Sequence, residues 1–241
     1  MTWIEDSKRG ILQSGLEGLM LLIKKGKKLD KHIKTILNSV NKTLDHLNQK
    51  LDEYWKNLKE ERAKQKEEAK IQSKLLKKLR AENEPKHVVD VMSYESLANC
   101  LINMMTALSQ NYTDAFLVYI RKESPQLLSS FLALTSFPNE RVVIAVASAF
   151  DSIIVNQANS LRNLFDTEEK IYEAFGSKLL NMYKFSFVTN EFENQLKRLT
   201  WDVYQLCPNN VKEKYAITWL SSLQRILLKM MVNLLFYSPN F

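Results

Sequence analysis

Glycine and proline, the residues that mark tight turns, are scarce in this sequence. Only 5 Gly and 5 Pro occur among its 241 residues. β-Sandwiches and β-barrels need many tight turns, and doubly wound α/β folds place glycines at their phosphate-binding turns. The composition therefore argues against both classes and favours an all-α protein.

Cysteine is equally scarce, with Cys100 and Cys207 as the only two in the chain. Two cysteines cannot build the disulfide framework that small secreted domains rely on. We expect both to be free, buried thiols. This favours a reducing, cytoplasmic compartment, and association with the cytoskeleton or a membrane stays open.

Targeting and membrane signals are weak. The first residues lack the basic region of a signal peptide, and the apolar run at 19–23 is short. No stretch of 18 uncharged apolar residues occurs. The nearest, 219–237, contains Arg225 and Lys229, so we interpret it as a buried helix, with a membrane span as the alternative.

Signals for catalysis are also missing. All three histidines lie in the first 90 residues, so the rest of the chain lacks the commonest general base and metal ligand. His32 and His46 are two heptads apart, about 21 Å along a helix, which is too far to share a ligand. No phosphate-binding glycine loop, metalloprotease His pair or nucleophile elbow occurs. We expect no enzymatic activity, no metal and no cofactor.

The charge is unevenly distributed. Residues 1–90 contain 21 Lys and Arg against 14 Asp and Glu, whereas residues 91–241 contain 13 of each, so the net charge of +7 belongs to the N-terminal part. Aromatic residues are concentrated in the other part, and aromatic side chains dominate core burial. The sequence thus predicts a packed domain preceded by an elongated, solvated appendage.

A heptad repeat is the strongest pattern in the appendage. The apolar residues are spaced 4, 3, 4, 3, 4, 3 and 4 apart, which is typical of a coiled coil. This association seam consists of Ile33, Leu37, Val40, Leu44, Leu47, Leu51, Tyr54 and Leu58. A single helix cannot bury such a stripe, so a partner is required, either another chain or another part of this one.

Beyond Leu58 the residues at the heptad positions are polar for four layers and then apolar again. The seam positions are then Glu61, Gln65, Glu68 and Gln72, followed by Leu75 and Leu79. Strong helix formers fill 59–70, so we expect one helix that ends near Glu84, because Pro85 disfavours an α conformation before it. A helix over 29–83 would be about 80 Å long.

The remaining sequence predicts a series of helices with short connections. Capping signals, including N-caps at Ser93 and Ser124, delimit segments at 93–110, 114–122, 124–137, 140–163, 166–183, 189–207 and 209–237. The fold class is therefore all-α: a long coiled-coil helix followed by a helical bundle or a short armadillo- or HEAT-like α-solenoid. The predicted parts are 1–28, a short amphipathic helix that runs from Ile11 to Lys25; 29–84, the heptad helix; 85–92, a linker; and 93–241, a helical domain.

Basic residues cluster where the amphipathic segment meets the heptad helix. They are Lys24, Lys25, Lys27, Lys28, Lys31 and Lys34. An amphipathic helix followed by lysines is typical of proteins that bind anionic membranes, and lysines also contact phosphates of nucleic acid. Nucleic acid is less favoured, because the segment is poor in the arginine and aromatic residues that read and stack bases.

The leading functional hypothesis is a non-catalytic scaffold or adaptor subunit. Its coiled coil would bind a protein partner, either a second copy or another chain, and its helical domain would present a surface to a second partner. Peripheral membrane binding through the basic N-terminal segment is the first alternative. Basic helical nucleic-acid binding is the second.

Overall fold

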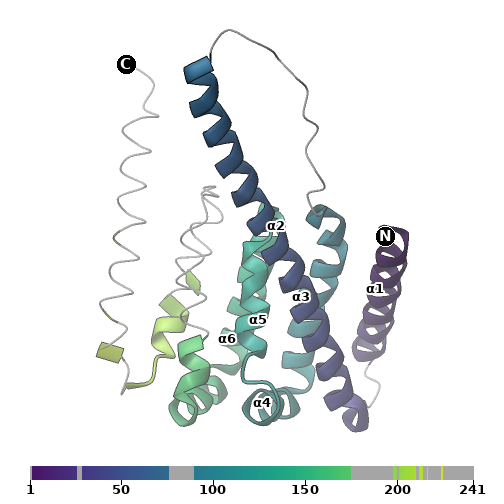
Figure 1. Ribbon diagram of the computed structural model, residues 1–241. Coiled ribbons are helices and arrows are strands. Elements are labelled where there is room, and N and C mark those ends of the chain that lie inside the picture. The colour runs from purple at the N-terminus through teal and green to yellow at the C-terminus, as the bar shows by residue number, and fades with distance from the viewer. Residues whose placement is uncertain are drawn as a thin grey trace, which may run out of the picture.

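Every regular element that the structure describes is a helix. The computed structural model describes residues 2–25, 29–75 and 90–174, together with 198–199, 201–209, 212–213, 216 and 224. Within these ranges no strand occurs. The predicted all-α class is confirmed, and its described helices form a bundle (Figure 1).

Helix α1 spans Thr2–Lys24, so it begins well before the predicted start at Ile11. It runs through Gly15 and Gly18, although each glycine costs a helix about 1 kcal/mol relative to alanine. Its inner side chains Leu16 and Ile23 are buried in the core. Tertiary packing of that face therefore outweighs the poor helix propensity.

Helix α2 spans Ile33–Leu75 and is preceded by the 3₁₀ turn η1 at Asp30–His32. The predicted continuation through the polar stretch 59–70 is confirmed. Polar side chains inside the helix bond back to the preceding turn. Thr43 Oγ1, for example, donates to the carbonyl of Ser39 at 2.7 Å. The predicted end near Glu84 lies outside the described residues.

The next elements are η2 (Val91–Tyr94), α3 (Glu95–Asn111) and α4 (Thr113–Lys122). They agree with the helices predicted at 93–110 and 114–122. The predicted N-cap at Ser93 is wrong, because Tyr94 occupies that position. The Ser93 hydroxyl donates instead to the carbonyl of Asp90 at 2.7 Å, within the 3₁₀ turn.

The helix predicted at 124–137 is divided into α5 (Leu127–Leu132) and η3 (Ala133–Ser136). The predicted N-cap at Ser124 is wrong, because Gln126 takes that place. The carbonyl of Ser124 accepts the amide of Leu127 at 3.1 Å, so residues 124–126 form a turn before the helix. The physical reason is that a Ser-Pro signal suits a turn as well as a cap.

Helix α6 spans Glu140–Thr167 and is capped by Asn139, whose Oδ1 accepts the amide of Arg141 at 2.9 Å. Gln157 has non-helical backbone angles, and its Nε2 donates to the carbonyl of Ser109 on α3, which holds a kink in place. The sequence predicts a break at 164–165, but the helix continues to Thr167 and the break falls at Glu168. Residues 169–174 are again helical.

Of the last two predicted helices, only parts are described. Residues 201–205 are helical, as predicted for 189–207. Tyr172 donates to the carbonyl of Val203 at 3.4 Å, and Arg162 donates to the carbonyl of Gln205 at 3.1 Å. These bonds attach this short helical stretch to the bundle. Most of the predicted helix 209–237 lies outside the described residues.

The bundle is built around α3. Helix α1 packs on one side of α3 and α6 on the other, while α2 lies across α3, α4, α5 and η3 (Figure 1). Stacked rings of Phe131 and Phe150, with centroids 4.8 Å apart, join α5 to α6. One continuous core includes buried side chains of α1, α2 and all later elements.

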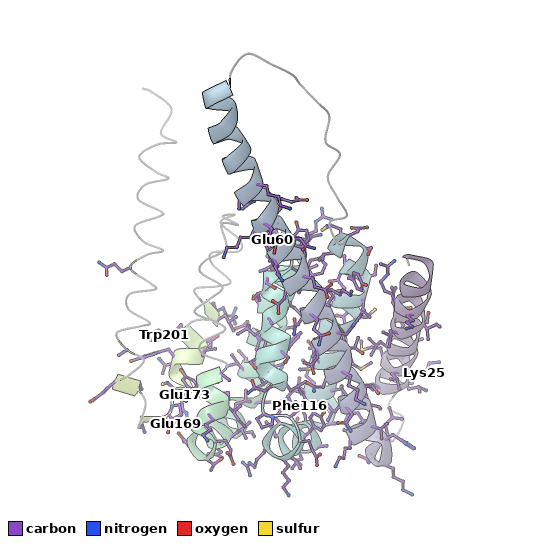
Figure 2. All side chains as sticks on the ribbon, in the orientation of Figure 1. Lys25, Glu60, Phe116, Glu169, Glu173 and Trp201 are labelled. Atoms are coloured by element: carbon purple, nitrogen blue, oxygen red, sulfur yellow. The ribbon has the colours of Figure 1, made fainter. Side chains whose placement is uncertain are left out.

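This core includes residues from both sides of the linker that the sequence predicts at 85–92. The proximal part of α2, from Ile33 to Leu51, is inside the bundle and does not form a separate appendage. Only the part of α2 beyond Leu58 projects past the other described helices, as the position of Glu60 shows (Figure 2). The side chains of Lys59, Glu60, Arg62, Ala63 and Lys64 are exposed there.

Candidate functional site

The structure places the first six residues of the predicted association seam in the interior of this chain. Each of them is at most 2% exposed; they are Ile33, Leu37, Val40, Leu44, Leu47 and Leu51. Tyr54 and Leu58 are half-buried, the side chain of Leu75 is not described, and Leu79 lies outside the described residues. Between Ile33 and Leu51 other helices of the same chain cover the seam, so these side chains are not accessible to a second protein.

Polar contacts hold the same part of α2 in register with α4, α5 and η3. Asn48 Nδ2 donates to the carbonyl of Ser130 at 2.8 Å, and Tyr119 donates to Asn38 Oδ1 at 2.8 Å. Trp55 Nε1 donates to the carbonyl of Ser136 at 2.7 Å. These bonds join segments that are far apart in the sequence, so a change in the register of α2 would break all of them.

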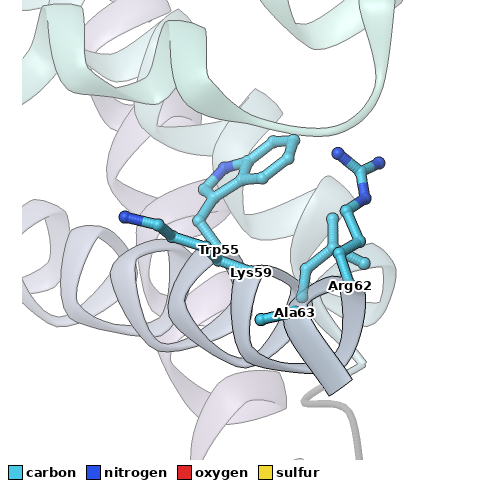
Figure 3. Close-up of a pocket in the computed structure, with 5 residues that line it drawn as sticks. Trp55, Lys59, Arg62 and Ala63 are labelled. Carbon is cyan, nitrogen blue, oxygen red and sulfur yellow. The ribbon is translucent and has the colours of Figure 1, made fainter. Parts of the chain in front are cut away.

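A hollow of about 340 Å³ lies where α2 leaves the bundle, and Trp55, Leu58, Lys59, Arg62 and Ala63 line it. The indole of Trp55 and the guanidinium of Arg62 both extend from α2 toward the neighbouring ribbon of the bundle (Figure 3). The hollow therefore combines an apolar wall with two cationic groups on one helix face.

The lysine cluster is only partly described. Lys25, Lys31 and Lys34 are exposed, whereas the side chain of Lys24 and all of Lys27 and Lys28 lie outside the description. Lys34 Nζ is 2.7 Å from Glu123 Oε1, and both side chains are well exposed. Water screens such a pair, so it contributes little to stability. Lys25 lies just beyond the lower end of α1 (Figure 2).

Helix α1 exposes large apolar side chains on the side away from α3. We call Ile11, Leu21 and Leu22 the outer face of α1; they are 73%, 59% and 40% exposed. Gly15 and Gly18 are exposed as well, and a Cβ built on either glycine would meet nothing within 4 Å. The outer face is thus apolar and sterically open.

The carboxylate of Glu17 is directed toward α3 and not toward the outer face. Cys100 Sγ on α3 lies 3.6 Å from Glu17 Oε1, and Gln13 Nε2 donates to the same oxygen at 3.0 Å. Burial, and to a lesser extent the neighbouring carboxylate of Glu17, raises the pKa of Cys100 to about 11. This thiol is almost entirely protonated at neutral pH and is a poor nucleophile.

Cys207 is also a free thiol. Burial raises the pKa of its side chain, although Tyr172 and Lys212 act in the opposite direction. Both described cysteines are therefore free, as expected from the sequence.

Two carboxyl groups meet between α6 and the helical stretch at 201–205. Asp151 is buried, and its Oδ1 lies 3.2 Å from Arg198 Nε. Burial, followed by a hydrogen bond to Asp151 and its charge, raises the pKa of Asp202, while Arg198 lowers it. Carboxyl pairs of this kind can act in acid–base catalysis. Here they link two helices, and neither carboxyl lines the hollow beside Trp55.

Two further observations concern metals and membranes. No group of three or more His, Cys, Asp or Glu side chains that could hold a metal occurs among the described residues. Within the same residues, α6 has the length and apolar composition of a membrane span, and half of its most apolar window is buried against the bundle. Core helices of water-soluble proteins share these properties, so the observation is weak evidence for a span.

Comparison with known proteins gives no relative for this chain. No protein-family model matches it, and neither a curated protein nor a solved structure matches it. Function must therefore be inferred from the chain's own surface.

Sequence reasoning missed the outer face of α1. It treated the apolar residues of 11–25 as one stripe, whereas the helix buries Leu16 and Ile23 and exposes Ile11 and Leu22 on the opposite side. A helical wheel separates the two sets. An α-helix completes a turn every 3.6 or so residues, which brings Ile11 and Leu22 to the same side and turns Leu16 and Ile23 away from it.

Proposed function

We propose that this protein is a non-catalytic scaffold that docks on an anionic membrane through the outer face of α1. The observation that supports this proposal is the exposure of three large apolar side chains on a helix that already buries Leu16 and Ile23 on the other side. Helices that are apolar on both sides are normally covered on both sides. A covering surface is therefore expected on the outer face.

Charge favours a membrane over a protein as that surface. Exposed Lys8 lies on α1, exposed Lys25 directly follows the helix, and exposed Lys31 lies in η1. The carboxylate of Glu17 is directed toward α3. Helices that lie on anionic membranes insert apolar side chains between lipids while lysines contact the headgroups.

The membrane proposal is tested by sedimentation with phosphatidylserine-containing vesicles. We expect the double variant Ile11→Glu/Leu22→Glu to bind about tenfold or more weakly, because it places carboxylates in the apolar contact. Both side chains are exposed, so the fold should be retained, and thermal unfolding checks this.

The matched control is Val118→Glu/Val155→Glu, which alters two exposed apolar side chains on α4 and α6. It should bind vesicles like the unmodified protein. Equal binding by all three proteins would exclude the outer face of α1 as the membrane contact. The protein could instead bind duplex DNA in a way that weakens with rising salt and is unaffected by the Ile11 and Leu22 changes. That result would favour nucleic acid over a membrane.

A protein partner is the second candidate, and it concerns a different surface. Since the seam from Ile33 to Leu51 is covered within the chain, a partner could pair only with the projecting part of α2. The hollow beside Trp55 and Leu58 supports this candidate, because apolar hollows flanked by cationic groups suit an acidic amphipathic helix.

This candidate is tested with the full chain by native affinity purification, comparing the unmodified protein with Leu58→Asp/Ala63→Glu. A specific co-purifying chain that is lost only in this variant supports a scaffold role for the projecting part of α2. Light scattering distinguishes a second copy of this chain from a different partner. Co-purification unchanged by the variant would contradict the candidate.

A further inference from the structure

A second hollow, of about 310 Å³, lies between α1 and the neighbouring elements of the bundle. Four elements contribute to it: α1, α2, η2 and the start of α3. The residues that line it are Lys8, Arg9, Leu12, His46, Tyr94 and Leu97. Its volume is at the lower end of the range for small-ligand sites. It is therefore large enough for a small headgroup and too small for a large cofactor.

The ring of Tyr94 organises the hollow. Arg9 Cζ lies 5.1 Å from the centre of this ring, in the range of a cation–π contact. The ring of His46 lies 6.5 Å from it, tilted by 59°. Arg9 also donates to the hydroxyl of Ser93, the residue before Tyr94. The guanidinium of Arg9 is thus held in place from two directions.

The lining is basic on one side and apolar on the other. Lys8, Arg9 and His46 supply nitrogen groups from two helices, and none of the six lining residues is a carboxylate. Leu97 is fully buried and Tyr94 nearly so. Such a concave site, with an apolar wall and converging basic donors, is suited to an anion attached to an apolar group.

We propose that this hollow binds a phosphate monoester. A phosphate monoester has three peripheral oxygens and a charge of about −1.5 to −2 at neutral pH, which matches several basic donors better than a single carboxylate does. Leu12 lines the hollow and is 39% exposed, so the hollow reaches the exposed surface of α1. The phosphate can therefore be that of a lipid headgroup, an assignment that rests on the proposed membrane docking, or that of a soluble phosphate ester.

The soluble arm of the test uses glycerol 3-phosphate and NMR of the full chain. We expect shifts confined to the backbone amides of Arg9, His46 and Tyr94 and the side chain of Arg9. The variant Lys8→Gln/His46→Gln should weaken binding about tenfold, because two basic donors are lost and both side chains are exposed. Arg9→Lys should also weaken it, since lysine keeps the charge but loses the planar fork.

The matched control is Lys56→Gln/Lys122→Gln, which removes two exposed lysines that do not line the hollow. It should bind glycerol 3-phosphate like the unmodified protein. Equal weakening in the control, or equal shifts with acetate at the same ionic strength, would overturn the proposal, because either result indicates general charge screening.

The membrane arm separates the two sources of phosphate. It compares phosphatidic acid with phosphatidylserine in vesicles of equal surface charge. A preference for phosphatidic acid that Lys8→Gln/His46→Gln abolishes supports a lipid headgroup. Glycerol 3-phosphate binding without any vesicle binding supports a soluble ester and refutes the proposed membrane docking. If neither probe binds, the hollow is not a phosphate site.

Discussion

The two halves of α2 have the same helical backbone but different surroundings. From Ile33 to Leu51 the heptad positions are apolar and almost completely buried by α3, α4, α5 and η3. From Lys59 to Lys64 the described side chains are exposed or half-buried, and the helix projects past the bundle (Figure 1). The change coincides with the point where the seam residues become polar.

This contrast shows what a heptad repeat does and does not specify. A heptad period states that a stripe must be covered, but helices of the same chain can cover it as well as a partner can. The proximal half finds its cover within the chain. The distal half is expected to be stable as a helix because its residues are strong helix formers and because Glu60 and Lys64 are spaced for an i,i+4 charge pair.

The largest expected effect on stability comes from truncating a buried side chain in the proximal half. Leu44→Ala should lower the free energy of unfolding by about 2–5 kcal/mol, because it leaves a cavity in a packed core. The corresponding change at half-buried Leu58 should cost clearly less. Urea unfolding followed by circular dichroism measures both. Similar costs at the two positions would contradict the difference between the halves.

The boundary between the halves is tested at Trp55. Trp55→Phe removes the indole N–H that donates to the carbonyl of Ser136. We expect a loss of about 1 kcal/mol, the usual contribution of one hydrogen bond. The same urea titration measures it, with Tyr54→Phe as the aromatic control beside it. A loss no larger than in that control would move the boundary toward Leu51.

Alkaline pH should weaken the proximal half in particular. Burial, and then the charges of Glu123 and Asp45, raises the pKa of Tyr119 above 10.0. The folded state keeps the phenol proton where the unfolded chain begins to lose it, so stability is constant below about pH 10 and falls as pH rises through the shifted pKa. Tyr119→Phe should cost about 0.5 kcal/mol at neutral pH and remove this alkaline dependence. Urea unfolding at a series of pH values measures both effects.

The smallest effects are expected on the projecting half. Lys59 and Lys64 are both exposed. Lys59→Gln and Lys64→Gln should therefore each change stability by only about 0.5 kcal/mol or less. Thermal unfolding at two salt concentrations checks this. A loss above about 1.5 kcal/mol would show that the projecting half is packed against something in solution.

Much of the fold could be predicted from local signals. The helices at 95–111, 113–122 and 140–167 agree with their predicted bounds within a few residues, because apolar periodicity and caps such as Asn139 act over one or two turns. The N-caps predicted at Ser93 and Ser124 are wrong. In both places a 3₁₀ or open turn precedes the helix, and serine stabilises such turns as well as caps.

The candidate sites were harder to predict than the helices. Lys25, Lys31 and Lys34 can be identified from their spacing and are exposed, while their contact with a membrane or with phosphate stays a prediction. The hollow formed by Arg9, His46 and Tyr94 has no local signal, because its residues come from four elements. Arg9 and Ser93 are 84 positions apart, and no periodicity relates them.

The sequence by itself determined that the chain is helical, where α3, α4 and α6 begin and end to within a few residues, and that one stripe of α2 must be covered. These properties depend on glycine and proline content, capping residues and apolar period, all of which act over a few residues. Only the tertiary structure decided that the stripe is covered within the chain, that α1 has an outer apolar face, and that basic side chains converge on Tyr94. Burial depends on which surfaces meet, and distant segments that pack in the bundle decide this.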